Sequence, residues 1–349
     1  MTRTRSSGGR GGRTRLVLVA AAALVGLAVT GMLSGFHLPL QPIEPDAAES
    51  RSELASVVPI GIRTFEAPAG LVVDEDLPYG VREDGTLLTL DVCRPADAVG
   101  SASSTEGTDA ATGALPAVVS IHGGSWARGD KANADWRNVC LWLASEGFVA
   151  ASVNYRLVPD AVFPAQLDDV ALAVEWLREP EQLAEFGIDP GRIGAFGGSA
   201  GGSLAALLGA RGDGPLDTGS RVAAVAELSG PVGLTGPALD TDGASPWLRS
   251  IVTDYLGCAP GDAACGAAAE ASAATHLDAS DPPVFLAQSD AEVIPLGQQT
   301  AFVAALEAAG VPVESLVVPG SAHSIGILDA PMRARVAAFL HAALDGVVR

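Results

Sequence analysis

The sequence predicts an α/β fold in which a mostly parallel sheet of about eight strands carries helices on both faces. Short, unbroken apolar runs alternate with amphipathic segments of helical length from about residue 115 onward, and strands covered on both faces have this continuous apolar character. The chain also has 349 residues, of which 48% are hydrophobic. This is enough for one domain with a large core, which we expect over residues 71–349.

The predicted elements follow in a regular order. A hairpin comes first, because the sequence alternates on both sides of the turn at residues 82–85. Its strands are expected between residue 72 and that turn and over 86–92, and the later strands over 117–121, 148–154, 192–196, 222–228, 283–288 and 312–318. Helices are expected over 135–146, 164–177, 298–309 and 331–344, with one more, made of small residues, directly after Ser199.

Three stretches interrupt this rhythm. Residues 37–70 carry proline and glutamate without a clear pattern and are interpreted as a linker. Residues 97–114 are mostly small and polar and predict a surface loop. Residues 235–280 combine a Pro-Trp pair, two cysteines and an alanine-rich run. They are a candidate lid over the carboxyl edge of the sheet, and the alternative is a surface excursion without a function.

The N-terminus predicts export. Residues 1–15 contain five arginines and no acidic residue, and residues 16–36 then run without a charge. A basic segment that precedes an apolar one is typical of a signal sequence. The apolar stretch of 21 residues exceeds the roughly 7–15 of a secretory core and is near the roughly 20 that span a bilayer. We therefore favour a signal anchor over a cleaved signal peptide. In both cases the domain is extracytoplasmic, membrane-anchored or secreted, while residues 1–15 stay cytoplasmic.

Charge and cysteine content restrict the partners. The formal net charge is −20, which argues against nucleic acid and anionic lipid surfaces, so we expect membrane contact through the N-terminal segment only. Four cysteines suit an oxidising compartment. Cys258 and Cys265 bracket a turn-forming hexapeptide and predict a small disulfide loop, and Cys93 and Cys140 are candidates for a second. A zinc site is disfavoured, because the histidines are not grouped with the cysteines.

Ser199 lies at the centre of the stretch around which the chain is organised. Residues 197–201 read GGSAG, which fits the motif G-x-S-x-G between an apolar strand and a small-residue helix. A serine in such a tight turn projects its hydroxyl group away from the backbone, and its neighbours must be small. Free N–H groups at the start of the helix can hold a developing negative charge. Ser199 is therefore the candidate nucleophile, although a glycine-rich turn can also bind phosphate.

A serine nucleophile needs a general base and an acid that orients the base. His323 is the candidate base, because it follows the last predicted strand. The acid should follow the preceding strand, where Asp290 and Glu292 both occur. We prefer Asp290, which comes first as the strand ends, and keep Glu292 as the alternative. The resulting order of serine, acid and histidine is the one found in α/β-hydrolases.

Donors for the oxyanion are expected from two places. One is the residue after the nucleophile, Ala200, and the other is the loop after the strand at 117–121, which supplies Gly123 and Gly124. Glycines let the backbone approach the substrate oxygen closely, so that N–H groups can point at it.

With these residues in view, the chain resembles the α/β-hydrolase superfamily. It is most similar to carboxylesterases of the hormone-sensitive-lipase-like and feruloyl/acetyl-esterase-like groups, over about residues 72–347. The motifs that carry the resemblance are HGGSW at 122–126, NYRL at 154–157, FPAQLDD at 163–169, GGSAG at 197–201, DPP at 281–283 and His323. The resemblance implies hydrolysis of carboxylic esters through an acyl-serine without a cofactor. It also implies that Gly123, Gly124 and Ala200 form the oxyanion hole.

Two positions depart from the family pattern. Ala291 occupies the position at which relatives carry the acid, with Asp290 and Glu292 on either side. Ser125 replaces the third glycine of the lipase-type loop, which disfavours a large hydrophobic acyl pocket. Trp126 and Tyr155 are candidates to line the substrate pocket, and the alternative is that they pack around the active-site loops.

The two carboxylates at the end of the motif at 163–169 are interpreted as structural residues. Asp168 and Asp169 precede an apolar helical repeat and are interpreted as residues that start a helix or fix a loop.

The sequence favours a serine carboxylesterase acting on short-chain or aromatic esters, on small molecules or on acylated polysaccharide. A serine peptidase on the same fold and a non-catalytic binding protein on a hydrolase scaffold are the alternatives. The displaced acid is the one feature that favours the binding protein.

Overall fold

The computed structural model describes residues 61–97 and 113–346. All described residues belong to one compact unit, which spans Val57–Arg349. Three predicted segments lie wholly or largely outside the described residues. They are the n-region and apolar segment at 1–36, most of the linker, and nearly all of the surface loop. Within the part that is described, no helix combines the length and the apolar character that a membrane crossing requires.

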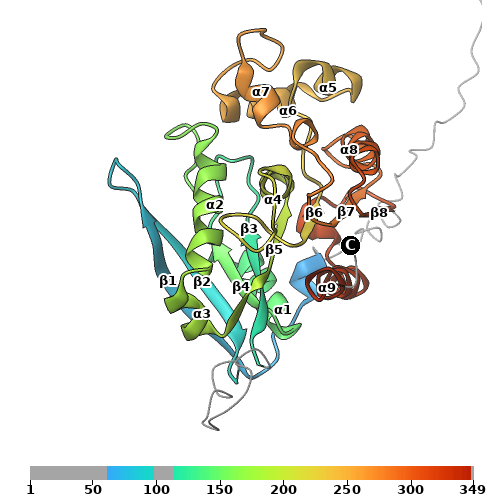
Figure 1. Ribbon diagram of the computed structural model, residues 1–349. Coiled ribbons are helices and arrows are strands. Elements are labelled where there is room, and N and C mark those ends of the chain that lie inside the picture. The colour runs from blue at the N-terminus through green and yellow to red at the C-terminus, as the bar shows by residue number, and fades with distance from the viewer. Residues whose placement is uncertain (1–60, 98–112, 347–349) are drawn as a thin grey trace, which may run out of the picture. The chain divides into compact units, whose positions relative to one another are not determined.

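This unit contains one sheet of eight strands, which confirms the predicted fold (Figure 1). The strand order is β1-β2-β4-β3-β5-β6-β7-β8. The pairs β1/β2 and β2/β4 are antiparallel, and every other pair is parallel. The strands are β1 (Leu71–Val81), β2 (Leu87–Pro95), β3 (Leu115–Ile121), β4 (Val149–Val153), β5 (Ile188–Gly198), β6 (Val225–Leu228), β7 (Val284–Ser289) and β8 (Val313–Val318).

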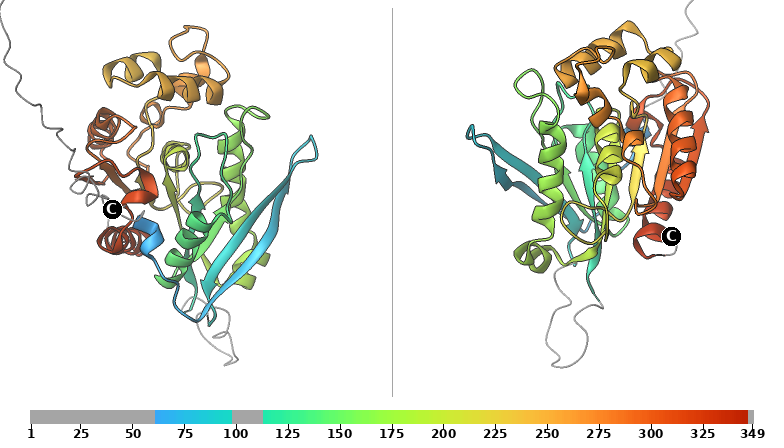
Figure 2. Two further views of the ribbon diagram at one scale, coloured as in Figure 1. Left: turned by 180° about the vertical axis from the view of Figure 1, so that it is seen from behind. Right: turned by 45° about the horizontal axis from the view of Figure 1, so that its top comes forward.

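Helices cover both faces of this sheet. Side chains of α1 and α9 belong to the core on one face, and those of α2, α3, α4 and α8 to the core on the other. In Figure 2, left, α1 and α9 lie on the side turned to the viewer. The helices are α1 (Ala134–Ser145), α2 (Ala165–Leu177), α3 (Pro180–Phe186), α4 (Ala200–Ala210), α8 (Leu296–Ala309) and α9 (Ala330–Leu344). Of these, only α3 has no counterpart in the sequence prediction.

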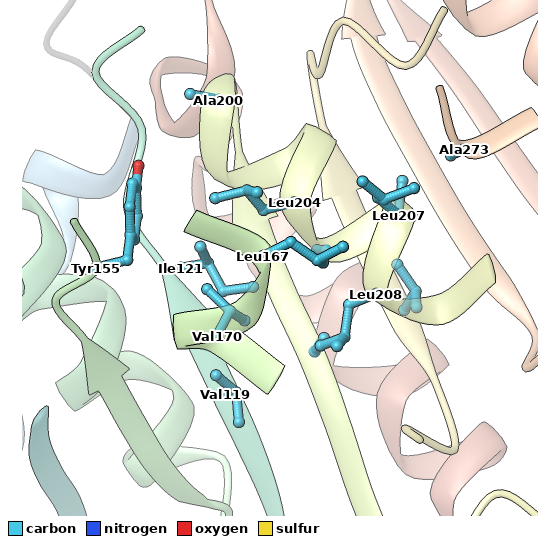
Figure 3. Close-up of a cluster of buried hydrophobic side chains, with 14 of the residues drawn as sticks. Val119, Ile121, Tyr155, Leu167, Val170, Ala200, Leu204, Leu207, Leu208 and Ala273 are labelled. Atoms are coloured by element: carbon cyan, nitrogen blue, oxygen red, sulfur yellow. The ribbon is translucent and has the colours of Figure 1, made fainter. Parts of the chain in front are cut away.

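Helix α4 lies at the centre of the larger core, and every one of its residues is buried. Its small residues allow the helix to pack closely between the sheet and α2. Leu204, Leu207 and Leu208 lie in one buried cluster with Leu167 and Val170 of α2 (Figure 3). A fully buried leucine stabilises the fold by about 1.5–3 kcal/mol. Packing on all sides therefore fixes the helix that begins next to Ser199.

The segment predicted as a lid forms a group of short helices. They lie beyond the C-terminal end of β6 and the N-terminal end of α4 (Figure 1). Two hydrogen bonds attach the segment to the rest of the domain: Ala273 N donates to Val232 O, and Leu234 N donates to Ser272 Oγ. We refer to residues 235–280 as the cap. Its elements are α5 (Gly236–Thr241), α6 (Pro246–Leu256), α7 (Gly266–Glu270) and η2 (Ala273–Thr275).

The end of the predicted linker belongs to the folded domain. Residues 61–64 form the short helix η1 (Gly61–Thr64), in which the Ile62 side chain is fully buried. Arg333 Nη1 of α9 donates to the Gly61 carbonyl group at 3.1 Å. The linker interpretation is therefore wrong for these residues, because a buried isoleucine and a buried hydrogen bond hold them against α9.

Both predicted disulfides are present. Cys93 of β2 is bonded to Cys140 of α1, and Cys258 is bonded to Cys265 within the cap. The first links the sheet to a covering helix, and the second closes the loop between α6 and α7.

Candidate active site

Ser199 occupies the sharp turn between β5 and α4. Its φ and ψ angles are 58° and −125°, a region that residues other than glycine rarely adopt. The glycines on either side make this turn possible. A methyl group on Gly197 would overlap the carbonyl group of Gly201, and one on Gly201 would overlap that of Ile121. The G-x-S-x-G spacing is thus a steric requirement of a turn that projects the serine hydroxyl group.

His323 follows β8 and contacts the serine. Its Nε2 atom lies 2.8 Å from Ser199 Oγ. Its Nδ1 atom is hydrogen-bonded to Oε2 of Glu292, whose side chain is fully buried. The three side chains form a continuous hydrogen-bonded series from carboxylate to imidazole to hydroxyl, which is the arrangement of a serine hydrolase.

Asp290 does not reach the histidine, so the preference for it as the partner of His323 is wrong. Its side chain is exposed and accepts a hydrogen bond from Gly320 N at 2.9 Å. The backbone explains this: Asp290 N still donates to Val318 O, and Ala291 N donates to Gly320 O. The chain follows the neighbouring β8 segment through Ala291 and turns inward only afterwards, which brings Glu292 to the histidine.

Two of the expected oxyanion donors, Gly123 and Ala200, lie beside the nucleophile. A methyl group on Gly123 would be 2.7 Å from the Gly198 carbonyl oxygen and 3.2 Å from Ser199 Cβ, so only glycine allows this approach. Gly124 has a φ of 128°, and Ala200 is the first residue of α4. Among the described residues, no acceptor is bonded to the N–H groups of Gly123, Gly124 or Ala200. These groups are free to donate to a substrate oxygen.

Tyr155 supports the loop of residues 122–126, which we call the glycine loop. Its hydroxyl group donates to the His122 carbonyl group at 2.8 Å, and its ring stacks on the His122 ring at 4.3 Å. His122 Nδ1 is 2.9 Å from the Gly123 carbonyl oxygen, to which it donates. Burial lowers the pKa of His122, which keeps the ring neutral. This packing fixes the backbone direction of the loop.

Trp126 and Tyr155 were candidates to line the substrate pocket or to pack around the active-site loops, and the structure shows the packing. Trp126 has no exposed surface and Tyr155 is only 4% exposed. The Trp126 ring stacks on Tyr255 of the cap helix α6, with 4.1 Å between ring centroids. The cap covers this side of the loop, so the two aromatic side chains support the glycine backbone instead of lining a surface.

Asp169 fixes the loop that carries Tyr155, which confirms the interpretation of this carboxylate. Its buried side chain accepts from the backbone N–H and the guanidinium group of Arg156, and it also pairs with Arg82. The position of Tyr155 is thus fixed in two ways, by the bonds between Asp169 and the adjacent Arg156 and by its own hydroxyl group.

Three residues near the site had no role in the sequence prediction. Ser229 and Ser324 both have a φ of 57°, and Ser324 N donates to Ser229 Oγ at 3.0 Å. This bond ties the residue after His323 to the end of β6. Glu227, two residues earlier, is buried beneath α4. The signal in the sequence is a glutamate inside an otherwise apolar strand.

Metal coordination has no visible basis in the described ranges. Between residues 61 and 97 and between 113 and 346, no group of three or more His, Cys, Asp or Glu side chains is arranged to hold an ion.

Comparison with known families agrees with this geometry. The BD-FAE family model matches residues 108–306, which is more than half of the chain. The chain belongs to the BD-FAE family. The matched range contains the glycine loop, the Ser199 turn and Glu292, and it ends before His323.

Curated relatives match over part of their length. Neutral cholesterol ester hydrolase 1 of Rattus norvegicus is 45% identical over 93 residues, which are 26% of this chain and 23% of that protein. A probable carboxylic ester hydrolase, LipM of Mycobacterium tuberculosis, is 27% identical over 272 residues, or 76% of this chain and 59% of LipM. The chain therefore spans about a quarter of the first relative and about three-fifths of the second.

Solved structures show the fold. A truncated carbohydrate esterase from gut microbiota has a TM-score of 0.63 at 23% identity, with 80% of this chain and all of that chain covered. A thermophilic esterase, Est2 of Thermogutta terrifontis, has a TM-score of 0.59 at 24% identity, with 80% and 94% covered. The fold is that of the α/β-hydrolases, as the resemblance implied.

Proposed function

We propose that this protein is a serine carboxylesterase that hydrolyses carboxylic esters through an acyl-serine intermediate. The observation that carries the proposal is the hydrogen-bonded series of Glu292, His323 and Ser199 beside free backbone N–H groups. Membership of the BD-FAE family and the ester hydrolases among the relatives support it.

In the first half-reaction Ser199 Oγ attacks the acyl carbon. His323 Nε2 lies at hydrogen-bonding distance and takes the hydroxyl proton as the bond forms. Glu292 holds the imidazole ring through Nδ1 and stabilises its positive charge. The bond between the acyl carbon and the alcohol oxygen then breaks, and His323 returns the proton to the leaving alcohol.

The carbonyl oxygen becomes negative in this step, and the N–H groups of Gly123, Gly124 and Ala200 receive it. Each lost donor of this kind costs about 2.7–4 kcal/mol of barrier stabilisation. In the second half-reaction His323 takes a proton from water, whose oxygen attacks the acyl carbon. The bond between the acyl carbon and Ser199 Oγ then breaks, His323 returns the proton to Ser199 Oγ, and the carboxylic acid leaves. Ser199 and His323 carry out every bond change and proton transfer of this cycle, so it needs no cofactor.

The proposed substrates are short-chain or aromatic esters, on small molecules or on a polysaccharide. Ser125 supports a small acyl pocket, because it replaces a glycine with a bulkier residue next to the oxyanion donors. One of the similar solved structures is described as a carbohydrate esterase, which supports an acylated polysaccharide as one substrate class. The cap is proposed to act as a lid over this pocket.

We also propose an extracytoplasmic location, with the N-terminal segment as the membrane anchor or export signal. Two disulfides support it, since such bonds persist in oxidising compartments.

The test is a substrate series with the full chain. Hydrolysis of p-nitrophenyl acetate, butyrate and octanoate, of a methyl ester of a hydroxycinnamic acid and of acetylated xylan would define the acyl group. A p-nitroanilide amide of the same acyl group separates an esterase from a peptidase. We expect turnover of the acetate or butyrate ester and at least tenfold less of the octanoate and the amide. No ester turnover at all would favour the non-catalytic alternative.

A further inference from the structure

A second buried carboxyl group lies below the nucleophile. Glu227 belongs to β6, which pairs with β5 on one side and with β7 on the other. Only 3% of the surface of Glu227 is exposed. Its Oε1 atom accepts a hydrogen bond from Gly230 N in the turn after the strand. No arginine, lysine or histidine among the described residues is paired with this side chain, in contrast to the buried Asp91 and Asp169.

Two glycines leave the space that this carboxyl group fills. A methyl group on Gly202, in the first turn of α4, would lie 2.8 Å from Glu227 Oε1. A methyl group on Gly230 would lie 2.5 Å from the same oxygen. Gly202 is three residues after Ser199, and the Ser199 carbonyl group receives the N–H of Ser203. The carboxyl group therefore lies against the turn that begins at the nucleophile.

We propose that Glu227 is a positioning residue for the series of Glu292, His323 and Ser199. It holds the first turn of α4 against the end of β6, and when it is ionised its charge acts on Glu292 and on the oxyanion donor Ala200. The proposal rests on the proposed esterase function, because it concerns the same reaction.

The charge state of Glu227 gives this role a measurable consequence. Burial raises the pKa of Glu227 to about 8, against the hydrogen bond from Gly230, and the negative charge of Glu292 raises it further. Glu292 comes from the loop after β7 and is bonded in turn to His323. The other elements packed on Glu227 contribute uncharged groups, namely Gly197 of β5, Gly202 and Ser203 of α4, and Gly230.

At neutral pH the carboxyl group is thus uncharged, and Glu292 is the single anion at the histidine. When Glu227 loses its proton, a second negative charge repels Glu292 and lies beside the helix turn that stabilises the oxyanion. Both effects weaken the transition state. The rate of ester hydrolysis should fall as the pH rises through about 8.

The experiment compares the wild type with Glu227→Gln, which keeps the shape of the side chain and is uncharged at every pH. The pH dependence of kcat and KM for p-nitrophenyl acetate and butyrate is measured from pH 6 to 9.5, with rates corrected for the ionisation of nitrophenol. Glu307→Gln, a change at an exposed site on α8, is the matched control. Ser199→Ala provides the background rate.

We expect kcat of the wild type and of Glu307→Gln to fall by about fivefold between pH 7 and pH 9.5, with KM nearly constant. The kcat of Glu227→Gln should lack this fall, so that the ratio of its kcat to that of the wild type rises by about fivefold from pH 7 to pH 9.5. An equal fall in Glu227→Gln, or none in the wild type, overturns the proposal. If Glu227→Gln does not fold, the wild-type profiles still decide the matter, because a flat kcat with both esters excludes it. Activity that survives in Ser199→Ala would instead refute the esterase mechanism itself.

Discussion

Replacement of Glu292 by glutamine removes the carboxylate from the series that reaches Ser199. The Glu292 side chain is fully buried, and one of its oxygens is bonded to His323 Nδ1. The other oxygen is buried without a partner among the described residues. The structure therefore gives this carboxylate one polar task, which is to orient the imidazole ring and balance its positive charge.

The expected loss follows from that task. Loss of the orienting acid in a serine hydrolase lowers kcat by about 10³–10⁴-fold, which corresponds to about 4–5.5 kcal/mol of barrier. Asp290→Asn is the matched control, since Asp290 is exposed and its amide can still accept from Gly320 N. That variant should keep kcat within about threefold of the wild type, as expected for an exposed hydrogen bond.

The assay is the hydrolysis of p-nitrophenyl butyrate at saturating substrate, with circular dichroism to show that both variants are folded. The KM value should change little in either variant, because neither carboxylate is expected to contact the ester. If Asp290→Asn loses activity and Glu292→Gln retains it, the assignment of the acid to Glu292 is refuted.

Three further predictions test the surroundings of the site. Tyr155→Phe removes the hydrogen bond to the His122 carbonyl group and should lower kcat/KM by about fivefold to tenfold, or about 1–1.5 kcal/mol; an unchanged kcat/KM would deny that this bond supports the oxyanion loop. Because the pKa of Glu227 rises from 4.5 to about 8 on folding, its contribution to stability is present below pH 4.5 and is lost as the pH rises to about 8. Urea unfolding should show Glu227→Gln gaining roughly 2–5 kcal/mol on the wild type between pH 5 and pH 8, and a pH-independent difference would contradict this. The double variant Cys93→Ala, Cys140→Ala opens a loop of 47 residues and should lower the free energy of unfolding by about 4 kcal/mol, whereas an unchanged urea midpoint would exclude that role for the disulfide.

The strands and the nucleophile could be predicted because their signals are local. Each buried strand is an apolar run bounded by polar or turn-forming residues. The Ser199 turn is visible in the sequence because its geometry requires glycines at fixed positions around the serine. The order of the elements then placed His323 after the last strand. None of these inferences needed knowledge of which distant segments touch.

The acid depends on a contact that the local sequence does not contain. Asp290 and Ala291 continue to pair with Val318 and Gly320, so the point at which the chain leaves the sheet is set by its neighbour. Asp290 follows β7 directly and is the natural choice when that pairing is unknown. The one extra step of pairing turns Asp290 outward and brings Glu292 to the histidine.

The positions of Trp126 and Glu227 have the same kind of cause. Trp126 adjoins the glycine loop, and its burial depends on Tyr255, which lies in the cap more than a hundred residues later. A glutamate in a short apolar strand is visible in the sequence, but its place beneath α4 depends on glycines in two other segments.

The most direct test of the account is the hydrolysis of p-nitrophenyl butyrate by the wild type and by Ser199→Ala, measured side by side at pH 7.5. The account predicts Ser199-dependent turnover by the wild type and a fall in kcat of at least about 10⁴-fold in the variant, since removal of a serine nucleophile leaves only the contribution of the oxyanion donors and binding. A folded Ser199→Ala protein that hydrolyses the ester at the wild-type rate would contradict it.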